Sequence, residues 1–369
     1  MQARESPLIP FSRLANCNDS RFGLTIYTLN PLEDPRWEEL VRTHPQASIY
    51  HTRGWLEALH RTYGYEPVVF STSPATADLT NGVVFCRVNS WLTGCRMVSL
   101  PFADHCEPLV ESADDRREIF SFLVRASKEE CWKYVELRPS SSDFLGESGA
   151  EKSNSFFQHV VDLGPDLEAL FRGLNKNSIQ RAIRRAEREG LSYEEGRSEA
   201  LLRNFYCLLL KTRRRHKLPP QPIDWFRNLI ACLGERLSIR LVSKNGQPVA
   251  SILTLSHRGT VVYKYGCSDS NFNNLGGTAL LFWRTIQEAK MQGLQEFDLG
   301  RSEIENTGLV AFKDRWRARR TMLTYLRLSA QRPRIATYGY GMQIAKYVFG
   351  CMPDGLLVAT GRMLYRHIG

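Results

Sequence analysis

Long apolar runs are missing from this sequence of 369 residues. No uninterrupted stretch approaches the roughly 18 residues that a membrane-spanning helix needs. The opening segment MQARESPLIPFSRL also lacks the apolar centre of a secretory signal peptide. From these two absences we expect a cytoplasmic protein rather than an exported or membrane-embedded one.

Paired cysteines are missing as well. The nine cysteines are scattered along the chain, their number is odd, and no two of them form a CxxC pair. This pattern argues against a disulfide framework and against a zinc site, and it fits a reducing compartment. We therefore expect no metal in this protein.

Acidic residues are few relative to basic ones, since 39 Asp and Glu stand against 49 Lys and Arg and give a formal net charge of +10. A basic surface attracts polyanions such as RNA, nucleotide-linked sugars, coenzyme A and anionic lipid headgroups. Charge alone does not choose among them, and a soluble protein that is merely basic is the simpler alternative. The hydrophobic content of 43% is ordinary for a globular protein, and the length favours two domains.

The order of elements indicates an internal repeat. In the first half we expect a helix, three strands, a helix and a strand, at 52–62, 67–71, 83–88, 97–100, 114–127 and 134–137. In the second half we expect three strands, a helix and a strand, at 237–242, 249–255, 261–265, 278–292 and 297–299. Three strands, a helix and a strand thus occur twice, which predicts two copies of one α/β unit.

The domain organisation follows from this repeat. Three helices are expected between the two sets of strands, at 178–188, 199–213 and 223–233. We divide the chain into a flexible lead-in, a first domain, a second domain and a C-terminal helical extension, at 1–21, 22–150, 151–330 and 331–369. The extension should hold two helices, at 343–350 and 356–367, which either dock on the domains or lie as basic amphipathic helices on an anionic membrane surface.

Two basic segments are candidates for binding an anion. In NKNSIQRAIRRAEREGL (175–191) an apolar stripe leaves a basic face, from which we select Lys176, Arg181 and Arg184. In KTRRRHK (211–217) no acidic residue lies nearby along the chain, and guanidinium groups bind phosphate in bidentate fashion. Arg213 and Arg214 are therefore further candidates, although a solvated basic face is the alternative for both segments.

A glycine pair marks a third candidate site. Gly276 and Gly277 directly precede the helix expected at 278–292, and the free backbone N–H groups at such a helix start suit an anion. Tyr265 lies on the strand that leads into this loop and is included as a binding candidate.

The fourth candidate region combines charged residues from both halves. FDLGRS (297–302) and NTGLVAFKDRW (306–316) should lie where the two central strands of such a sheet part, so Arg301, Phe312 and Lys313 are expected to face a cleft, with Lys313 on an extended stretch. In the first half, SLPFADHCEPL (99–109) presents Asp104 after a strand. We expect the neighbouring Cys106 to be inert packing rather than a nucleophile.

Taken together, these segments resemble proteins of the FemAB family in type and order, over roughly residues 45–330. The resemblance is closest to the FemAB-related proteins that accompany exosortase systems in bacteria making extracellular polysaccharide. It implies an α/β fold of two GNAT-like acyltransferase domains in tandem, each a mixed sheet flanked by helices. Established members transfer an amino acid from aminoacyl-tRNA to an amine of a peptidoglycan precursor, and the resemblance places Lys313 and Asp104 near the reacting groups.

Three departures from related patterns are visible. The stretch 223–240 has no room for the coiled-coil arm that some members carry, and Arg317 stands where the family usually has glycine. Acetyltransferases bind the coenzyme A pyrophosphate with a Q/R-x-x-G-x-G/A pattern, and the nearest match here, 273–278, lacks its first and last residues.

The resemblance implies an acyl or aminoacyl transferase that forms an amide on a small-molecule or lipid-linked cell-envelope precursor, with aminoacyl-tRNA as donor. The alternative is an acyl-CoA-dependent N-acyltransferase of exopolysaccharide or envelope glycan synthesis. A non-catalytic binder of nucleotide- or lipid-linked sugar is a third hypothesis. We expect no tightly bound cofactor and no DNA partner, and we consider tRNA and the inner face of the membrane as partners.

Overall fold

Twelve strands form one continuous sheet in the computed structural model, which describes residues 25–141, 144, 150–328 and 347–368. The expected lead-in at 1–21 and all of 331–346 lie outside these residues, and so does the first part of the helix expected at 343–350. The strands are β1 (Tyr27–Leu29), β2 (Glu66–Ser71), β3 (Val83–Val88), β4 (Arg96–Val98), β5 (Val135–Leu137), β6 (Glu151–Asp162), β7 (Ser192–Gly196), β8 (Leu237–Lys244), β9 (Gln247–His257), β10 (Thr260–Ser268), β11 (Glu296–Glu303) and β12 (Arg319–Leu328).

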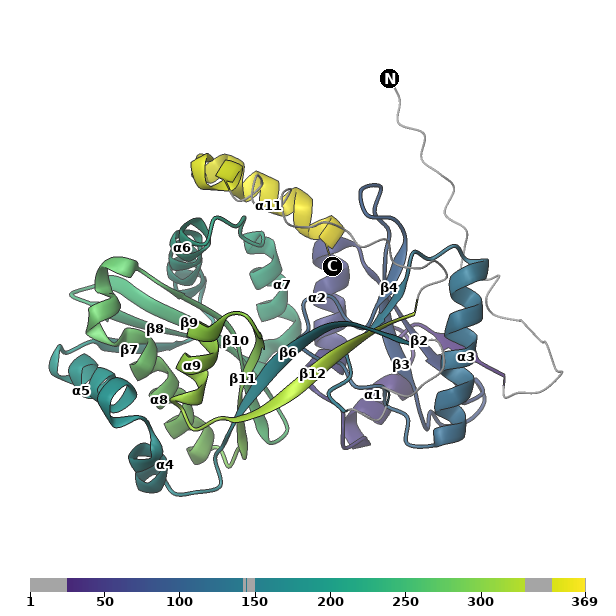
Figure 1. Cartoon of the computed structure of the whole chain (residues 1–369), viewed down its shortest axis with the longest axis horizontal. Coiled ribbons are helices and arrows are strands. Elements are labelled where there is room, and N and C mark those ends of the chain that lie inside the picture. Colours follow the sequence, from purple (N-terminus) through teal and green to yellow (C-terminus); the bar gives the residue numbers. More distant parts are fainter. Residues whose placement is uncertain (1–24, 142–143, 145–149, 329–346, 369) are drawn as a thin grey trace.

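Helices cover both halves of this sheet (Figure 1). They are α1 (Pro35–Thr43), α2 (Arg53–Tyr63), α3 (Ala113–Glu129), α4 (Leu167–Gly173), α5 (Arg181–Arg188), α6 (Glu199–Arg215), α7 (Ile223–Leu233), α8 (Gly277–Met291), α9 (Thr307–Asp314) and α11 (Asp354–Ile368). None of the helices in the described ranges is both long and apolar enough to cross a membrane.

The sheet contains the predicted repeat. Its order is β1-β2-β3-β4-β5-β12-β6-β11-β10-β9-β8-β7, so the two halves mirror each other when they are followed inward from the two edges. In both halves three antiparallel pairings are followed by a parallel one and then by an antiparallel one. Two helices follow the edge strand and one precedes the fifth strand in each half. The prediction of two copies of one α/β unit is confirmed.

The two copies exchange their last strands. β12 comes from the end of the second copy but pairs with β5 of the first, whereas β6 follows the first copy but pairs with β11 of the second. The two exchanged strands also pair with each other, which makes the sheet continuous, and Figure 1 shows them crossing the middle of the molecule. A single sheet and a repeat therefore coexist.

The apolar core also joins the halves. Trp55 of α2 and Trp225 of α7 meet edge to face with ring centroids 5.4 Å apart, and both are fully buried. Gly54 is needed at this contact, because an added Cβ would lie 2.5 Å from the carbonyl oxygen of Cys232. The halves are thus held together by a close-packed interface as well as by the sheet.

One expected conformation is wrong. The sequence predicts Lys313 on an extended stretch, but this residue lies in the last turn of α9. The side chain of Asn306 caps this helix by accepting a hydrogen bond from the Leu309 N–H at 3.2 Å. An asparagine at this position is a strong helix-start signal, and it outweighed the short length of the segment.

Candidate active site

The parallel strands β10 and β11 part in the middle of the second half. They pair only over Thr260–Val262 and Glu296–Asp298, although both strands continue beyond these residues. Lys264 of β10 and Arg301 of β11 follow the point of separation. The opening between these strands is therefore lined by two cations from neighbouring strands.

A carboxylate from the first half lies at this opening. Asp104 accepts a hydrogen bond from Lys264 at 3.2 Å, and its Oδ1 lies 3.8 Å from the Arg301 Nε. The Tyr325 hydroxyl, from the exchanged strand β12, donates to the backbone carbonyl of Asp104 at 2.6 Å and fixes the segment. Burial raises the pKa of the Asp104 carboxyl, but Lys264, Arg301 and Lys313 together outweigh burial and hold that pKa below its usual value.

Lys313 approaches the same place from α9. Its amine is buried and donates hydrogen bonds to the backbone carbonyls of Gly300 at 2.8 Å and Arg301 at 3.0 Å. Burial lowers the pKa of Lys313 to about 8, although Asp104 and Asp298 oppose the effect. An ammonium group has three donor hydrogens, so one remains for a further acceptor.

Gly300 lies between the carboxylate of Asp104 and the amine of Lys313. Its φ of +72° is in the left-handed region, and a Cβ there would lie 2.9 Å from Asp104 Oδ2. Only glycine allows both the turn and this close approach without strain. The predicted catalytic pair, Asp104 and Lys313, therefore converges on one turn.

A second acid–base pair stands beside this turn. Asp298 accepts from the Gly300 N–H at 2.7 Å and from Gln158 at 2.8 Å, and its Oδ2 lies 3.7 Å from His105 Nε2. Burial lowers the pKa of His105, but its contact with Asp298 outweighs burial and the pKa is raised above its ordinary value. His105 therefore holds its proton more firmly than a free imidazole does.

A groove with a basic border lies at the start of α8. A cavity of about 780 Å³ is bordered by α5 and by the loop before α8, and a smaller one of about 230 Å³ continues from it toward Phe312. The two share four residues, Ser178, Ala182, Asn273 and Gly276, so we treat them as one space, the α5–α8 groove. No acidic residue occupies the first turn of α8, which leaves its N–H groups free to attract an anion.

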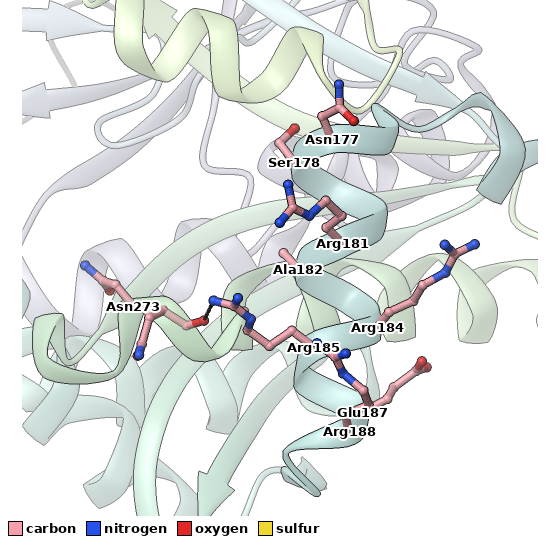
Figure 2. Close-up of a pocket in the computed structure, with 11 residues that line it drawn as sticks. Asn177, Ser178, Arg181, Ala182, Arg184, Arg185, Glu187, Arg188 and Asn273 are labelled. Atoms are coloured by element: carbon pink, nitrogen blue, oxygen red, sulfur yellow. Dashed lines mark hydrogen bonds between the residues drawn. The ribbon is translucent and has the colours of Figure 1, made fainter.

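Figure 2 shows how the arginines of α5 lie around this groove. Arg181 and Arg185 point toward the loop that carries Asn273, and Arg185 donates to the carbonyl oxygen of Asn274 at 3.1 Å. Arg184 points to the other side, where it lies over the ring of Phe171 at 5.5 Å. Gly276 is required by close packing, because a Cβ there would lie 2.2 Å from the carbonyl oxygen of Ala182.

The matching place in the first copy does not suit an anion. There α3 takes the position of α8, and its first turn carries Asp114 and Asp115. The cavity nearby is bordered by two further acids, Glu107 and Glu111. Negative charge at a helix start repels an anion, so within the described residues the start of α8 suits an anion better than the start of α3 does.

Other predicted binding residues lie elsewhere. Lys176 is exposed and is not among the residues bordering the groove, and the hydroxyl of Tyr265 accepts a hydrogen bond from buried Trp225 at 2.9 Å, within the core. Neither Arg213 nor Arg214 borders the groove.

The basic segment KTRRRHK also has counter-charges that the sequence did not reveal. Arg214 pairs with Asp354 of α11, and Lys211 pairs with Asp269 at 2.6 Å. These acids are distant in sequence, so scanning the neighbouring residues could not find them. Part of the charge of this segment is thus neutralised by the fold, and its role in binding a phosphate stays a prediction.

Sequence reasoning missed Lys264, whose amine lies nearer to the Asp104 carboxylate than the Arg301 guanidinium does. Its side chain is only 5% exposed. A signal was present, because it is a single lysine inside the otherwise apolar strand segment VVYKY. Such an interruption marks a site where a charge must have a partner, since an unpaired buried charge is costly.

Residues 175–314 match the family described as "Acetyltransferase (GNAT) domain". The chain has a tandem GNAT fold. No match is found among the curated proteins. The second half of the chain thus carries an acyltransferase domain, as the resemblance implied.

Several solved structures share this fold. FemX is 12% identical, with a TM-score of 0.63 over 79% of this chain and 95% of FemX. L-PGS from Bacillus licheniformis is 16% identical, with a TM-score of 0.53 over 86% of this chain and 98% of that one. A tandem GNAT protein from the clavulanic acid biosynthesis pathway is 9% identical, with a TM-score of 0.53 over 84% and 99%. The FemAB-type fold is confirmed, while the closer likeness to exosortase-associated proteins stays a prediction.

Proposed function

We propose that the protein is an N-acyltransferase that takes an acyl group from an acyl-CoA donor and forms an amide on a cell-envelope precursor. The observation that carries this proposal is the α5–α8 groove, which combines a free helix start with Arg181 and Arg185. Its volume of about 780 Å³ is of the size of pockets that hold a single small ligand. The family match, to a domain described as an acetyltransferase, supports the same donor.

We propose that the groove binds the donor and that the reaction takes place at the charged cluster, by which we mean Asp104, His105, Lys264, Arg301 and Lys313. The phosphates of the donor would lie on the N–H groups at the start of α8, with the two arginines as counter-charges. The smaller cavity reaches Phe312, whose neighbour Lys313 belongs to the charged cluster. The flexible arm of the donor, which links its phosphates to the thioester, would follow this path and bring the thioester to the opening between β10 and β11.

Each group in the cluster then has a role. A neutral amine attacks the thioester carbon, a C–N bond forms, the C–S bond breaks, and the proton lost by the amine ends on the departing thiol. Lys313 would stabilise the oxyanion of the tetrahedral intermediate with its third hydrogen, an effect often worth a few kcal/mol. Because the pKa of Asp104 is lowered, this carboxylate suits orienting the amine, and His105 is better placed to pass the proton.

The acceptor is proposed to be an amine of an envelope precursor. Support comes from the likeness to FemX and to the C-terminal domain of a putative lysylphosphatidylglycerol synthetase from Agrobacterium fabrum, which is 14% identical with a TM-score of 0.54 over 88% of this chain and 96% of that one. The acceptor would approach Asp104, on the side of the first copy. The resemblance to exosortase-associated proteins adds an exopolysaccharide precursor as a candidate.

Aminoacyl-tRNA, which the sequence placed first as donor, becomes the second candidate. One observation favours it: Arg184 and Arg188 border the α5–α8 groove as well as Arg181 and Arg185, so four arginines of α5 lie there (Figure 2). Against it, the second basic segment is neutralised in part by Asp354 and Asp269. A long polyanion therefore has a shorter basic track than the sequence indicated.

Calorimetric titration with acetyl-CoA, with uncharged tRNA and with aminoacyl-tRNA, each at several salt concentrations, tests the donor. We expect saturable binding of acetyl-CoA, weakened at least about tenfold when Arg181 and Arg185 are both replaced by alanine. Arg172→Ala is the matched control, since this exposed arginine of α4 borders neither cavity. Tight tRNA binding with a steep salt dependence and no binding of acetyl-CoA would reverse the order of the two donors.

A further inference from the structure

Exposed large hydrophobic side chains gather along one edge of the molecule. Of the nine found in the described part of the chain, seven belong to two regions, and we call these seven the apolar edge. They are Trp91 and Leu92 in the β3–β4 hairpin, and Tyr347, Val348, Leu356, Met363 and Ile368 near the C-terminus. The other two, Met291 and Met322, lie at the end of α8 and on β12.

The two regions are in contact. The ring of Trp91 meets the ring of His367 edge to face, with centroids 5.7 Å apart. The carbonyl oxygen of His367 accepts hydrogen bonds from Thr93 at 3.0 Å and from Arg96 at 2.8 Å. Figure 1 shows α11 and the β3–β4 hairpin on the same side of the molecule. The hairpin therefore extends the surface of α11 rather than forming a separate patch.

The inner face of α11 is firmly docked. Leu357 is 1% exposed, and a Cβ at Gly361 would lie 2.0 Å from the carbonyl oxygen of Pro220. The ring of Tyr365 meets that of Phe102 at 5.8 Å, two residues from Asp104. The sequence left docking and membrane contact as alternatives for this helix, and its inner face is used for docking.

The outer face of α11 stays apolar and has a basic border. Leu356, Ala359 and Met363 are exposed at spacings of three and four residues, which places them on one side of the helix. Exposed Arg362 and Arg366 flank them. Exposed Lys217 lies beside Gly350, just before α11, and exposed Lys133 donates a hydrogen bond to the carbonyl oxygen of Thr93 in the hairpin. Two acids near this face, Asp354 and Asp224, are paired with Arg214 and Arg362.

We propose that the apolar edge docks on the surface of an anionic lipid bilayer. A tryptophan and several aliphatic side chains that protrude from a rigid support can enter the headgroup region, and the surrounding arginines and lysines attract anionic headgroups. A second copy of the chain suits this surface less well, because two such faces would bring like charges together. This inference is independent of the proposed reaction, since it uses none of the residues of that site.

Vesicle flotation tests the proposal. The whole protein is mixed with vesicles of phosphatidylcholine, or of phosphatidylcholine with phosphatidylglycerol, at low and high salt. We expect binding to the anionic vesicles, weakened by salt. Met363→Ser and the pair Trp91→Ser with Leu92→Ser should each weaken it roughly tenfold, since apolar area no longer enters the lipid. The pair Met291→Ser with Met322→Ser is the matched control and should bind like the unmodified protein.

Three results would overturn the proposal. The first is no binding of the unmodified protein to anionic vesicles, or equal binding to neutral ones. The second is a loss of vesicle binding in Met291→Ser with Met322→Ser that equals the loss in the apolar-edge variants. The third is a dimer in analytical ultracentrifugation that Met363→Ser dissociates while vesicle binding stays unchanged, which would make the edge a self-association surface. Thermal melts of all variants ensure that each comparison uses folded protein, and acyl-CoA binding checks that the proposed donor groove is intact.

Discussion

The carboxylate of Asp104 and the amine of Lys264 lie 3.2 Å apart, although 160 positions separate them in the sequence. One belongs to the first copy of the repeat and the other to the second. Both side chains are largely buried, with exposures of 15% and 5%. Arg301 and Lys313 add positive charge around the same carboxylate, so a single acid from the first copy is held by three cations of the second.

This arrangement predicts that replacing Asp104 lowers the free energy of unfolding more than replacing Lys264 does. Asp104→Asn leaves buried cations without their partner and should lower the free energy of unfolding by about 3 kcal/mol. Lys264→Met should cost less, because Arg301 still faces Asp104. The double variant should lose at least about 1 kcal/mol less than the sum of the two single losses. Urea unfolding of the four proteins measures these terms, and strictly additive losses would contradict the pairing.

The lowered pKa of Lys313 predicts an alkaline limit to activity. If its charge stabilises the oxyanion, turnover should fall as pH rises through about 8, where the amine loses its proton. Lys313→Ala should lower turnover roughly ten- to a thousandfold at neutral pH without preventing folding. Lys313→Arg should keep part of the activity and move the alkaline limit upward, because guanidinium stays protonated. An unchanged pH profile in Lys313→Arg would remove Lys313 from the reaction.

The lowered pKa of Lys313 also predicts that the free energy of unfolding changes with pH. The folded state loses the Lys313 proton near pH 8, whereas the unfolded chain loses it near 10.5. Between these values the unfolded state binds more protons, so the Lys313 contribution to the free energy of unfolding rises with pH. Urea unfolding across this window should show the rise in the unmodified protein. In Lys313→Met the part of this rise that comes from Lys313 should be absent.

The glycine before α8 can be tested against a matched glycine. Gly276→Ala should weaken acyl-CoA binding at least about tenfold and destabilise the protein, because its Cβ would meet the backbone of Ala182 at a φ of +80°. Gly246→Ala has nearly the same φ, +78°, but its Cβ would meet nothing within 4 Å. It should cost about 1 kcal/mol of stability and leave donor binding unchanged. If Gly276→Ala and Gly246→Ala weakened donor binding equally, the loss would come from backbone strain alone and not from the position of Gly276 in the groove.

Cys106 is expected to take no part in chemistry. Burial raises its pKa well above the usual thiol value, so it stays protonated although the ring of His51 lies 3.4 Å away. Cys106→Ala should keep full turnover once a donor is known. In the folded protein iodoacetamide should modify the exposed Cys131, Cys207 and Cys351, but not Cys106, as read by mass spectrometry of the peptides. Loss of turnover in Cys106→Ala would require a covalent mechanism.

Local patterns in the sequence determined most of the individual elements. β3 and α7 have the predicted bounds, and α8 differs from its prediction by only one residue at each end. These segments have regular apolar spacing or clear end signals, which depend only on neighbours along the chain. The strands β6, β7 and β12 were not predicted. Much of β6 and β7 is exposed or only half-buried, so their apolar pattern is weak.

Tertiary structure decided how these elements combine. The sequence indicated two copies of one unit and marked Lys313 and Asp104 through a family resemblance, but it could not show that β6 and β12 change places. It also could not pair Asp104 with Lys264 or Arg214 with Asp354, because each pair joins residues at least 140 positions apart. Burial and long-range charge set these contacts, and both are properties of the packed chain rather than of any local stretch of residues.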